Sequence, residues 1–132
     1  MTRSRFLERL QAGEVLVADG ATGTNLQARG MTLGVPGETW VLQNPDAIVQ
    51  LHRDFIEAGA DIVLTCTFGG SAIRLEQIGF VGRMEEVNRC AVELARTATE
   101  DVPALVAGSI GPLGHLLKPL GPVEEADAVT AY

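Results

Sequence analysis

Three short apolar runs, each followed by small polar residues and glycine, constrain the fold of this chain more than any other feature. Near-continuous apolar runs of this length are typical of strands that are buried on both faces of a parallel sheet. Because parallel strands end at the same edge of a sheet, we expect the residues after the runs to form one wall of a single site. The runs occupy residues 14–18, 61–65 and 104–107.

Helical patterns lie between and around these runs. Apolar residues at helical spacing, with capping residues and glycines at the ends, predict helices over residues 4–11, 22–28, 45–58, 71–79, 84–99 and 123–132. Glycine and proline predict loops over residues 31–39 and 111–122. Long connections between strands imply parallel pairing and right-handed crossovers. The order predicts an α/β fold of about three βα units, with parallel strands and outer helices.

Two architectures fit parallel strands with polar carboxyl ends, the (β/α)8 TIM barrel and the doubly wound sheet. No GxGxxG turn follows the first run, which argues against a dinucleotide-binding sheet. A barrel needs roughly 200 residues or more, whereas this chain has 132. We therefore expect residues 1–132 to form a single partial domain, the N-terminal portion of a barrel.

The composition excludes several classes of partner. The chain is 46% hydrophobic and 20% charged, which is typical of a globular domain. A formal charge of −7 disfavours nucleic acids and anionic membranes, and no apolar run approaches the ~20 residues of a membrane span. The two cysteines are too few for a disulfide framework and form no CxxC pair, so we expect a reducing, cytoplasmic setting.

The turn after the first run is a candidate for ligand binding. Residues 19–23 read DGATG, and a Gly-rich turn that enters a helix presents backbone N–H groups to an anion. The carboxylate of Asp19 suits an ammonium group. The alternative, that Asp19 only caps a tight connection, stays open. Thr65 and Thr67 share one side of their strand, and either pocket lining or the β propensity of threonine explains them.

The residue types that bind metals show no ligand spacing, so we expect no metal site in this chain. They are Cys66, Cys90, His52 and His115. Cys90 is expected to be a packed core thiol, and His52 a solvated or hydrogen-bonding residue on a helix face. For His115, in a loop near the third strand end, a substrate role stays open.

Motifs in order along the chain resemble the homocysteine S-methyltransferase family, which includes the homocysteine-binding module of cobalamin-dependent methionine synthase and betaine–homocysteine methyltransferase. The resemblance covers nearly the whole chain. It implies a (β/α)8 TIM barrel longer than this sequence. The motifs are DGATGT at 19–24, NPD at 44–46 with His52, EAGAD at 57–61, TCTFG at 65–69 and GSIGP at 108–112.

The resemblance implies that this chain holds substrate-binding residues and no catalytic residue. The carboxylate after the first strand would contact the amino group of homocysteine, and the amides of the following turn would face its carboxylate. Small hydroxyl-bearing residues at the next two strand ends would line the pocket. The implied substrate-binding residues are Asp19, Gly20, Ala21, Thr22, Thr65, Thr67 and Ser109.

The resemblance also implies a zinc ion, bound by three cysteines on later strands outside this chain. Zinc would hold the homocysteine sulfur as a thiolate that attacks a methyl group and gives methionine. A pocket glutamate expected after the fourth strand also lies outside. The implied methyl donors are methylcobalamin or methyltetrahydrofolate, betaine, and S-methylmethionine. We therefore expect a methyltransferase part that binds homocysteine and is inactive alone.

A second hypothesis is a half-barrel binding or assembly module. Open sheet edges and a half-exposed apolar face favour association, so we expect a homo-oligomer or a partner that supplies the missing C-terminal barrel half. The chain stops at Tyr132 inside an expected helix, as a truncated form, a fragment or one piece of a split barrel would. A third hypothesis is another barrel enzyme, such as an aldolase or an enzyme that binds a phosphate-bearing ligand. The lack of lysine at the strand ends argues against Schiff-base chemistry.

Overall fold

The structure, a computed structural model, describes residues 4–132 and has an α/β fold with parallel strands. The predicted helices over residues 4–11, 22–28 and 84–99 are confirmed with the same bounds. In chain order the elements are α1 (Ser4–Gln11), α2 (Thr22–Ala28), α3 (Glu38–Gln43), α4 (Pro45–Glu57), β1 (Ile62–Leu64), α5 (Ala72–Glu76), α6 (Met84–Thr99), β2 (Leu105–Ala107) and α7 (Glu125–Ala131).

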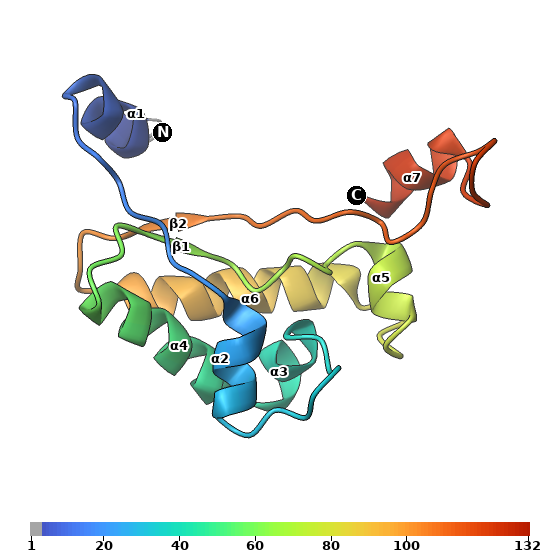
Figure 1. Cartoon of the computed structure of the whole chain (residues 1–132), viewed down its shortest axis with the longest axis horizontal. Helices are drawn as coiled ribbons and strands as arrows, with labels where there is room; N and C mark the ends of the chain where they lie inside the picture. The colour runs from blue at the N-terminus through green and yellow to red at the C-terminus, as the bar shows by residue number, and fades with distance from the viewer. Residues whose placement is uncertain (1–3) are drawn as a thin grey trace.

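The sheet of the described residues consists of β1 and β2, which pair in parallel with Val63 opposite Val106. The connection between these strands runs through α5 and α6, as the length of the crossover predicts. Helix α4 packs against β1 and α6 against β2, so the two longest helices lie on one side of the sheet (Figure 1). Helices α1 and α7 stand at opposite ends on the other side (Figure 1).

The prediction of a first strand over residues 14–18 is wrong. This segment makes only an isolated parallel bridge, between Ala18 and Ile62. The amides of Asp61 and Ile62 both donate to the carbonyl of Val17, and no ladder continues from there. Val15 and Val17 are 87% and 53% exposed. Because the face that carries Val15 and Val17 is uncovered and Leu16 is only partly buried, apolar side chains alone do not hold the segment in a strand.

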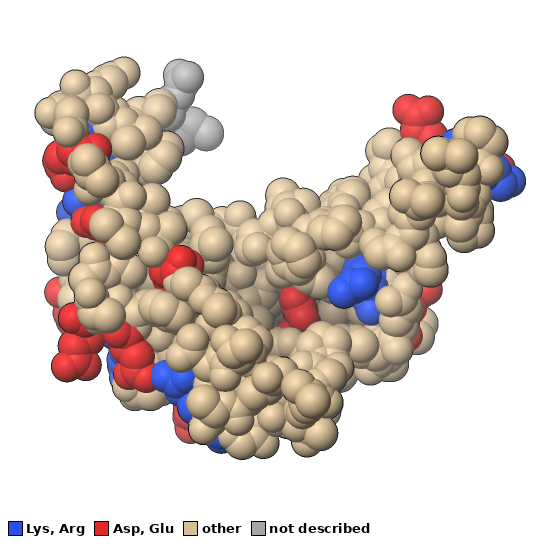
Figure 2. Space-filling view, viewed as in Figure 1, with Lys and Arg blue, Asp and Glu red and all other residues tan. Residues whose placement is uncertain are grey.

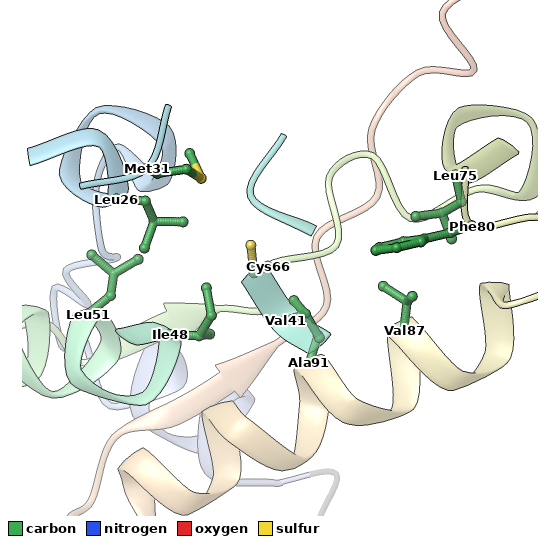
Figure 3. Packing of buried hydrophobic residues seen from close by; sticks show 10 residues of the cluster. All are labelled: Leu26, Met31, Val41, Ile48, Leu51, Cys66, Leu75, Phe80, Val87 and Ala91. Carbon is green, nitrogen blue, oxygen red and sulfur yellow. The ribbon is translucent and has the colours of Figure 1, made fainter. Parts of the chain in front are cut away.

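The core lies between α2, α3, α4 and α6, below the sheet. Figure 3 shows Leu26 and Leu51 side by side at one end of this core, and Phe80 between Leu75 and Val87 at the other. Alanines on α6 let α3 and α4 approach it closely, and Ala91 lies against Val41 of α3 (Figure 3). The core supports the carboxyl end of β1, where the predicted site residues lie.

Two further expectations are wrong. The predicted loop over residues 31–39 ends early, because α3 begins at Glu38. The predicted solvated His52 is 1% exposed, and neither ring nitrogen has a hydrogen-bond partner among the described residues. Position 52 lies on the face of α4 that packs inward with Ile48 and Leu51, because residues three and four apart share one helix face.

The molecule is hollowed between its α1 and α7 ends, and the side of the sheet that α4 and α6 leave uncovered is turned toward this hollow (Figures 1 and 2). Large apolar side chains that are exposed include Val15, Ile110 and Leu120. None of the helices among residues 4–132 has the length and apolar character needed to cross a membrane.

Candidate functional site

A closed ring of hydrogen bonds joins the carboxyl ends of β1 and β2. The amide of Ser109 donates to Thr65 Oγ1 at 3.0 Å, and the hydroxyl of Thr67 donates to the carbonyl of Ser109 at 2.7 Å. The two hydroxyl oxygens lie 2.7 Å apart. Because Thr67 uses its one proton on Ser109, Thr65 is the donor between them. The structure therefore brings these three predicted residues together, with both hydroxyl protons used inside the ring.

Asp19 lies on the other side of β1. Its Oδ2 accepts a hydrogen bond from the amide of Leu64 at 3.0 Å, and its own amide donates to Ile62 at 2.9 Å. The second oxygen, Oδ1, is buried without a hydrogen-bond partner in residues 4–132. Burial raises the pKa of the Asp19 carboxyl, and the Leu64 amide opposes this shift. The side chain therefore bonds to β1 rather than to the turn that follows it.

The turn after Asp19 leads into α2 without a side-chain cap. Ala21 occupies the N-cap position and has no side-chain hydrogen bond to the first turn of the helix. Gly20 packs against the ring of Phe55, because a Cβ there would lie 3.3 Å from Phe55 Cε1. The amides at the start of α2 thus have no side-chain acceptor from the N-cap. Their predicted contact with a carboxylate stays a prediction.

A cavity of about 500 Å³ lies between the start of α2, the loop before α3 and the end of β1. We call it the Glu38 cavity, after the buried carboxylate on its wall. Thr22, Thr65 and Ser109 line it, whereas Asp19 and the turn residues Gly20 and Ala21 do not. The seven predicted residues therefore surround the end of β1 but do not all share one cavity.

Sequence reasoning missed two charged residues of this cavity, Glu38 and Arg74. Glu38 is 6% exposed, and its Oε1 accepts a hydrogen bond of 2.5 Å from the amide of Gly69. It lies in the first turn of a six-residue helix, which is too short for a periodic pattern to reveal which face is buried. The signal that was present is an acid directly after the GVPG stretch of residues 34–37.

A larger hollow of about 730 Å³ lies along α6, between Thr67, Ser109 and the end of α7. The hydroxyl of Tyr132 donates to the carbonyl of Gly111 at 2.5 Å and so ties α7 to the segment after β2. Thr67 lines this hollow and not the Glu38 cavity. The ring of Thr65, Thr67 and Ser109 therefore lies between two cavities.

The cysteines and histidines of the described chain do not meet. No group of three or more His, Cys, Asp or Glu residues among positions 4–132 is placed to share a metal ion. Burial, with the charge of Glu38, raises the pKa of the Cys66 thiol to about 12, so it stays protonated at neutral pH. Cys90 is half-buried and packs against the core, as predicted. His115 instead pairs with Gln77 at 2.9 Å.

Comparison with known proteins decides which family these features belong to. The model of the family described as homocysteine S-methyltransferase matches residues 16–132. The chain belongs to the homocysteine S-methyltransferase family. It is 39% identical over 106 residues to the S-methylmethionine–homocysteine S-methyltransferase of Pongo abelii, and 38% identical over 113 residues to the betaine–homocysteine S-methyltransferase of Xenopus tropicalis. Each match covers 80% of this chain.

Solved structures of a family member have the same fold. The oxidised form of the homocysteine methyltransferase MmuM of Escherichia coli superimposes with a TM-score of 0.75 at 30% identity, over 84% of this chain. Its metallated form gives 0.70 at 29% identity. The chain spans 42% of the length of these structures, and 28% and 27% of the two enzymes named above. This chain therefore corresponds to only part of a homocysteine S-methyltransferase.

Proposed function

We propose that this chain is the amino-acid-binding part of an enzyme that transfers a methyl group to the sulfur of homocysteine and forms methionine. The family match over residues 16–132 supports the reaction class. In this proposal the two parallel strands and their helices are the N-terminal portion of a (β/α)8 barrel. The similarity to 42% of the length of a homocysteine methyltransferase structure supports that architecture.

The observation that carries the binding role is the unpartnered oxygen of Asp19. A buried carboxylate oxygen without a donor has lost its hydration and has gained no hydrogen bond in return. An ammonium group supplies three N–H donors and a positive charge, so it relieves both costs at once. We therefore assign Asp19 to the amino group of homocysteine, with the amides of Gly20, Ala21 and Thr22 toward its carboxylate.

The chemistry of the sulfur is assigned to residues outside this chain. In the family a zinc ion activates the thiol, but the donor groups among residues 4–132 do not fit a metal site. Catalytic zinc needs three protein ligands, whereas Cys66 and Cys90 are separately packed and the Cys66 thiol has a pKa of about 12. No step of the reaction is therefore assigned to a metal held by this chain. Turnover is expected only when the rest of the barrel is present.

A second candidate, an assembly module, is favoured by the exposed surface around the strand ends. Among the described residues β2 pairs only with β1, so its outer edge keeps free N–H and C=O groups. Val15 and Ile110 are 87% and 81% exposed. Either a second copy of the chain or the remaining half of the barrel would cover such an edge.

Calorimetric titration with homocysteine and homoserine tests the binding role. Homoserine keeps the amino and carboxylate groups and replaces the sulfur by oxygen. Because this chain is assigned the amino-acid end, both compounds should bind with similar affinity, and D-homocysteine should bind more weakly. If neither L-homocysteine nor L-homoserine binds to a sample whose circular dichroism spectrum shows that it is folded, the proposal is contradicted. Methionine formation in the presence of the complementary barrel half tests the reaction.

A further inference from the structure

The hollow of about 730 Å³ along α6, which we call the α6 hollow, is lined by charges of alternating sign. Helices α3 and α4 pack against α6, whose buried residues are small or apolar. The exposed charged residues that line the hollow from this helix are Glu85, Arg89, Glu93 and Arg96. Positions 85, 89, 92 and 96 are four, three and four residues apart, which is the spacing by which one helix contacts another along a seam.

These four charges are open to further partners. Arg89 pairs with Glu85 one turn away at 2.5 Å, but the two side chains remain 66% and 80% exposed. An exposed pair of this kind contributes little by itself. Glu93 and Arg96 form no ion pair within residues 4–132. The stripe therefore offers both signs of charge to whatever covers the hollow.

The order of the charges is complementary to itself when it is reversed. Glu85 and Arg96 are equally far in sequence from the point between positions 90 and 91, and Arg89 and Glu93 are equally far from position 91. An antiparallel helix of the same sequence, centred on that point, places a base opposite each acid and an acid opposite each base. A two-fold axis requires a patch that is complementary to itself in this way.

The same pattern disfavours other occupants. A small ion of either sign would meet as much repulsion as attraction along an alternating stripe. The formal charge of −7 makes two copies of the chain repel one another in general. A contact between copies therefore needs a local match of charges, and the stripe on α6 supplies one.

The hollow also has apolar surface beside its charges. Val92 lies in the middle of the stripe and is half-buried. Ile110 and Tyr132 line the hollow and are 81% and 58% exposed. An apolar centre with a charged rim is the usual composition of a contact between two proteins.

The free edge of β2 points to the same symmetry. Helix α6 packs against β2, and among the described residues this strand pairs only with β1. If two such edges pair antiparallel about a two-fold axis perpendicular to the sheet, the helices that pack on them lie on the same face of the joined sheet. The two copies of α6 are then neighbours and run antiparallel, as the charge pattern requires.

We propose that the α6 hollow is the contact with a second copy of this chain, in which α6 packs antiparallel against α6 of that copy. Glu85 of each copy lies opposite Arg96 of the other. Arg89 lies opposite Glu93 in the same manner, so the contact contains four ion pairs between the copies. This inference goes beyond the proposed function and does not depend on it.

Reversal of charge tests the pairing by sedimentation equilibrium of the chain. Glu85→Arg and Arg96→Glu each place like charges opposite one another at two symmetric positions, so each should raise the Kd of the dimer at least about tenfold. The variant that carries both substitutions restores the two pairs in the opposite sense. Its Kd should return to within about threefold of that of the unaltered chain. A double variant that associates no better than the single variants would overturn the inference.

Two control variants separate pairing from net charge. Glu86→Arg changes an exposed acid of α6 that does not line the hollow, and Arg53→Glu changes an exposed base of α4. They alter the net charge by the same amounts as the test variants and should leave the Kd of the dimer unchanged. If they weaken association as much as the test variants do, net charge is the cause and the inference is wrong.

A cross-link tests the geometry without a change of charge. Because position 92 lies close to the expected axis, the Val92→Cys variant should form a disulfide between copies on mild oxidation, identified by peptide mapping. Thr97→Cys, at an exposed position of α6 outside the hollow, should not. A dimeric sample that forms no link at position 92 would contradict the antiparallel contact.

The other possible occupants give different results. An unaltered chain that stays monomeric, or that associates equally well after every charge reversal, would show that no copy covers the α6 hollow. The remaining barrel portion is the other candidate. If Arg96→Glu weakens binding of that portion and leaves self-association unchanged, the barrel covers the hollow and the inference is overturned.

Discussion

The hydroxyl groups of Thr65 and Thr67 lie 2.7 Å apart and link β1 to the backbone of Ser109. Both side chains are almost fully buried. The residues between a strand end and a loop are normally the most mobile part of a βα unit. Here each hydroxyl both donates and accepts, so three hydrogen bonds tie this end of the sheet together. A substrate could contact these threonines only through their remaining lone pairs and their methyl groups.

Replacing Thr67 by valine keeps the shape of the side chain and opens the ring. The proton of the Thr65 hydroxyl then lacks an acceptor and the Ser109 carbonyl lacks its donor, and an unsatisfied buried group costs about 1–3 kcal/mol. We expect the free energy of unfolding in urea to fall by that amount. Thr97→Val, at an exposed position of α6, is the control and should change stability by less than about 0.5 kcal/mol. Equal effects of the two substitutions would show that the ring adds no stability.

Replacing Asp19 by asparagine should separate ligand binding from folding. Burial raises the pKa of this carboxyl, so the folded state disfavours its charge and neutral asparagine should fold at least as well. Homocysteine, however, loses an ionic partner worth about 1.5–3 kcal/mol. Titration calorimetry should show weaker binding, while Asp46→Asn, an exposed change on α4, should leave it unchanged. Unaltered affinity in the Asp19 variant would remove this residue from the site.

His52 should make the protein sensitive to mild acid. Burial lowers its pKa from 6.5 to about 4, so the unfolded chain binds a proton more readily than the folded chain as the pH falls below 6.5. Stability should therefore be complete above that pH and fall by about 2 kcal/mol between about pH 7 and about pH 5. Urea unfolding at the two pH values measures the loss.

The His52→Leu variant tests whether this one side chain is responsible. In this variant the loss of stability that protonation of His52 causes between about pH 7 and about pH 5 should disappear, because leucine does not titrate. His115→Gln alters the other histidine of the chain, which lies on the surface beside Gln77, and should retain the full dependence. An acid response that is the same in His52→Leu and in the unaltered protein would contradict the assignment.

Gly37 is required by the sulfur of Cys66 rather than by its own backbone. Its φ of −59° and ψ of −30° are open to any residue, but a Cβ would lie 2.9 Å from Cys66 Sγ. Gly37→Ala should therefore destabilise the fold by about 1–3 kcal/mol. Adding Cys66→Ala should recover part of that loss, a coupling that a double-mutant cycle in urea measures. Gly23→Ala, where nothing lies within 4 Å, should be neutral or stabilising.

The chain without a partner should associate through its open sheet edge. Light scattering should show a dimer or a larger species, because strand edges and exposed apolar side chains favour pairing. The substitutions Val15→Lys and Ile110→Lys should each reduce association. Leu33→Lys, at a similarly exposed position in the loop after α2, should not. A compact monomer of the unaltered chain at micromolar concentration would contradict this expectation.

Helices of this protein could be predicted from the sequence because their determinants are local. The spacing of apolar residues in α6 and the glycine after α2 act within a few residues of chain, and the predicted bounds are confirmed. The carboxyl ends of β1 and β2 lie side by side for a related reason. Parallel pairing follows from the length of the crossover, whatever the details of the contacts.

The burial of single polar residues was decided by tertiary structure. The sequence around His52 did not reveal that this face of α4 is buried. The sequence around Glu38 did not reveal that the amide of Gly69 would donate a hydrogen bond to its carboxylate. Conversely, residues 14–18 have the composition of a strand but are mostly exposed and make one bridge. Local sequence determines which conformation a segment prefers, whereas burial and pairing depend on segments far away in the chain. The chemistry of this site depends on that second kind of information, because the partners of Asp19, Glu38 and Thr67 all lie more than a helix away in sequence.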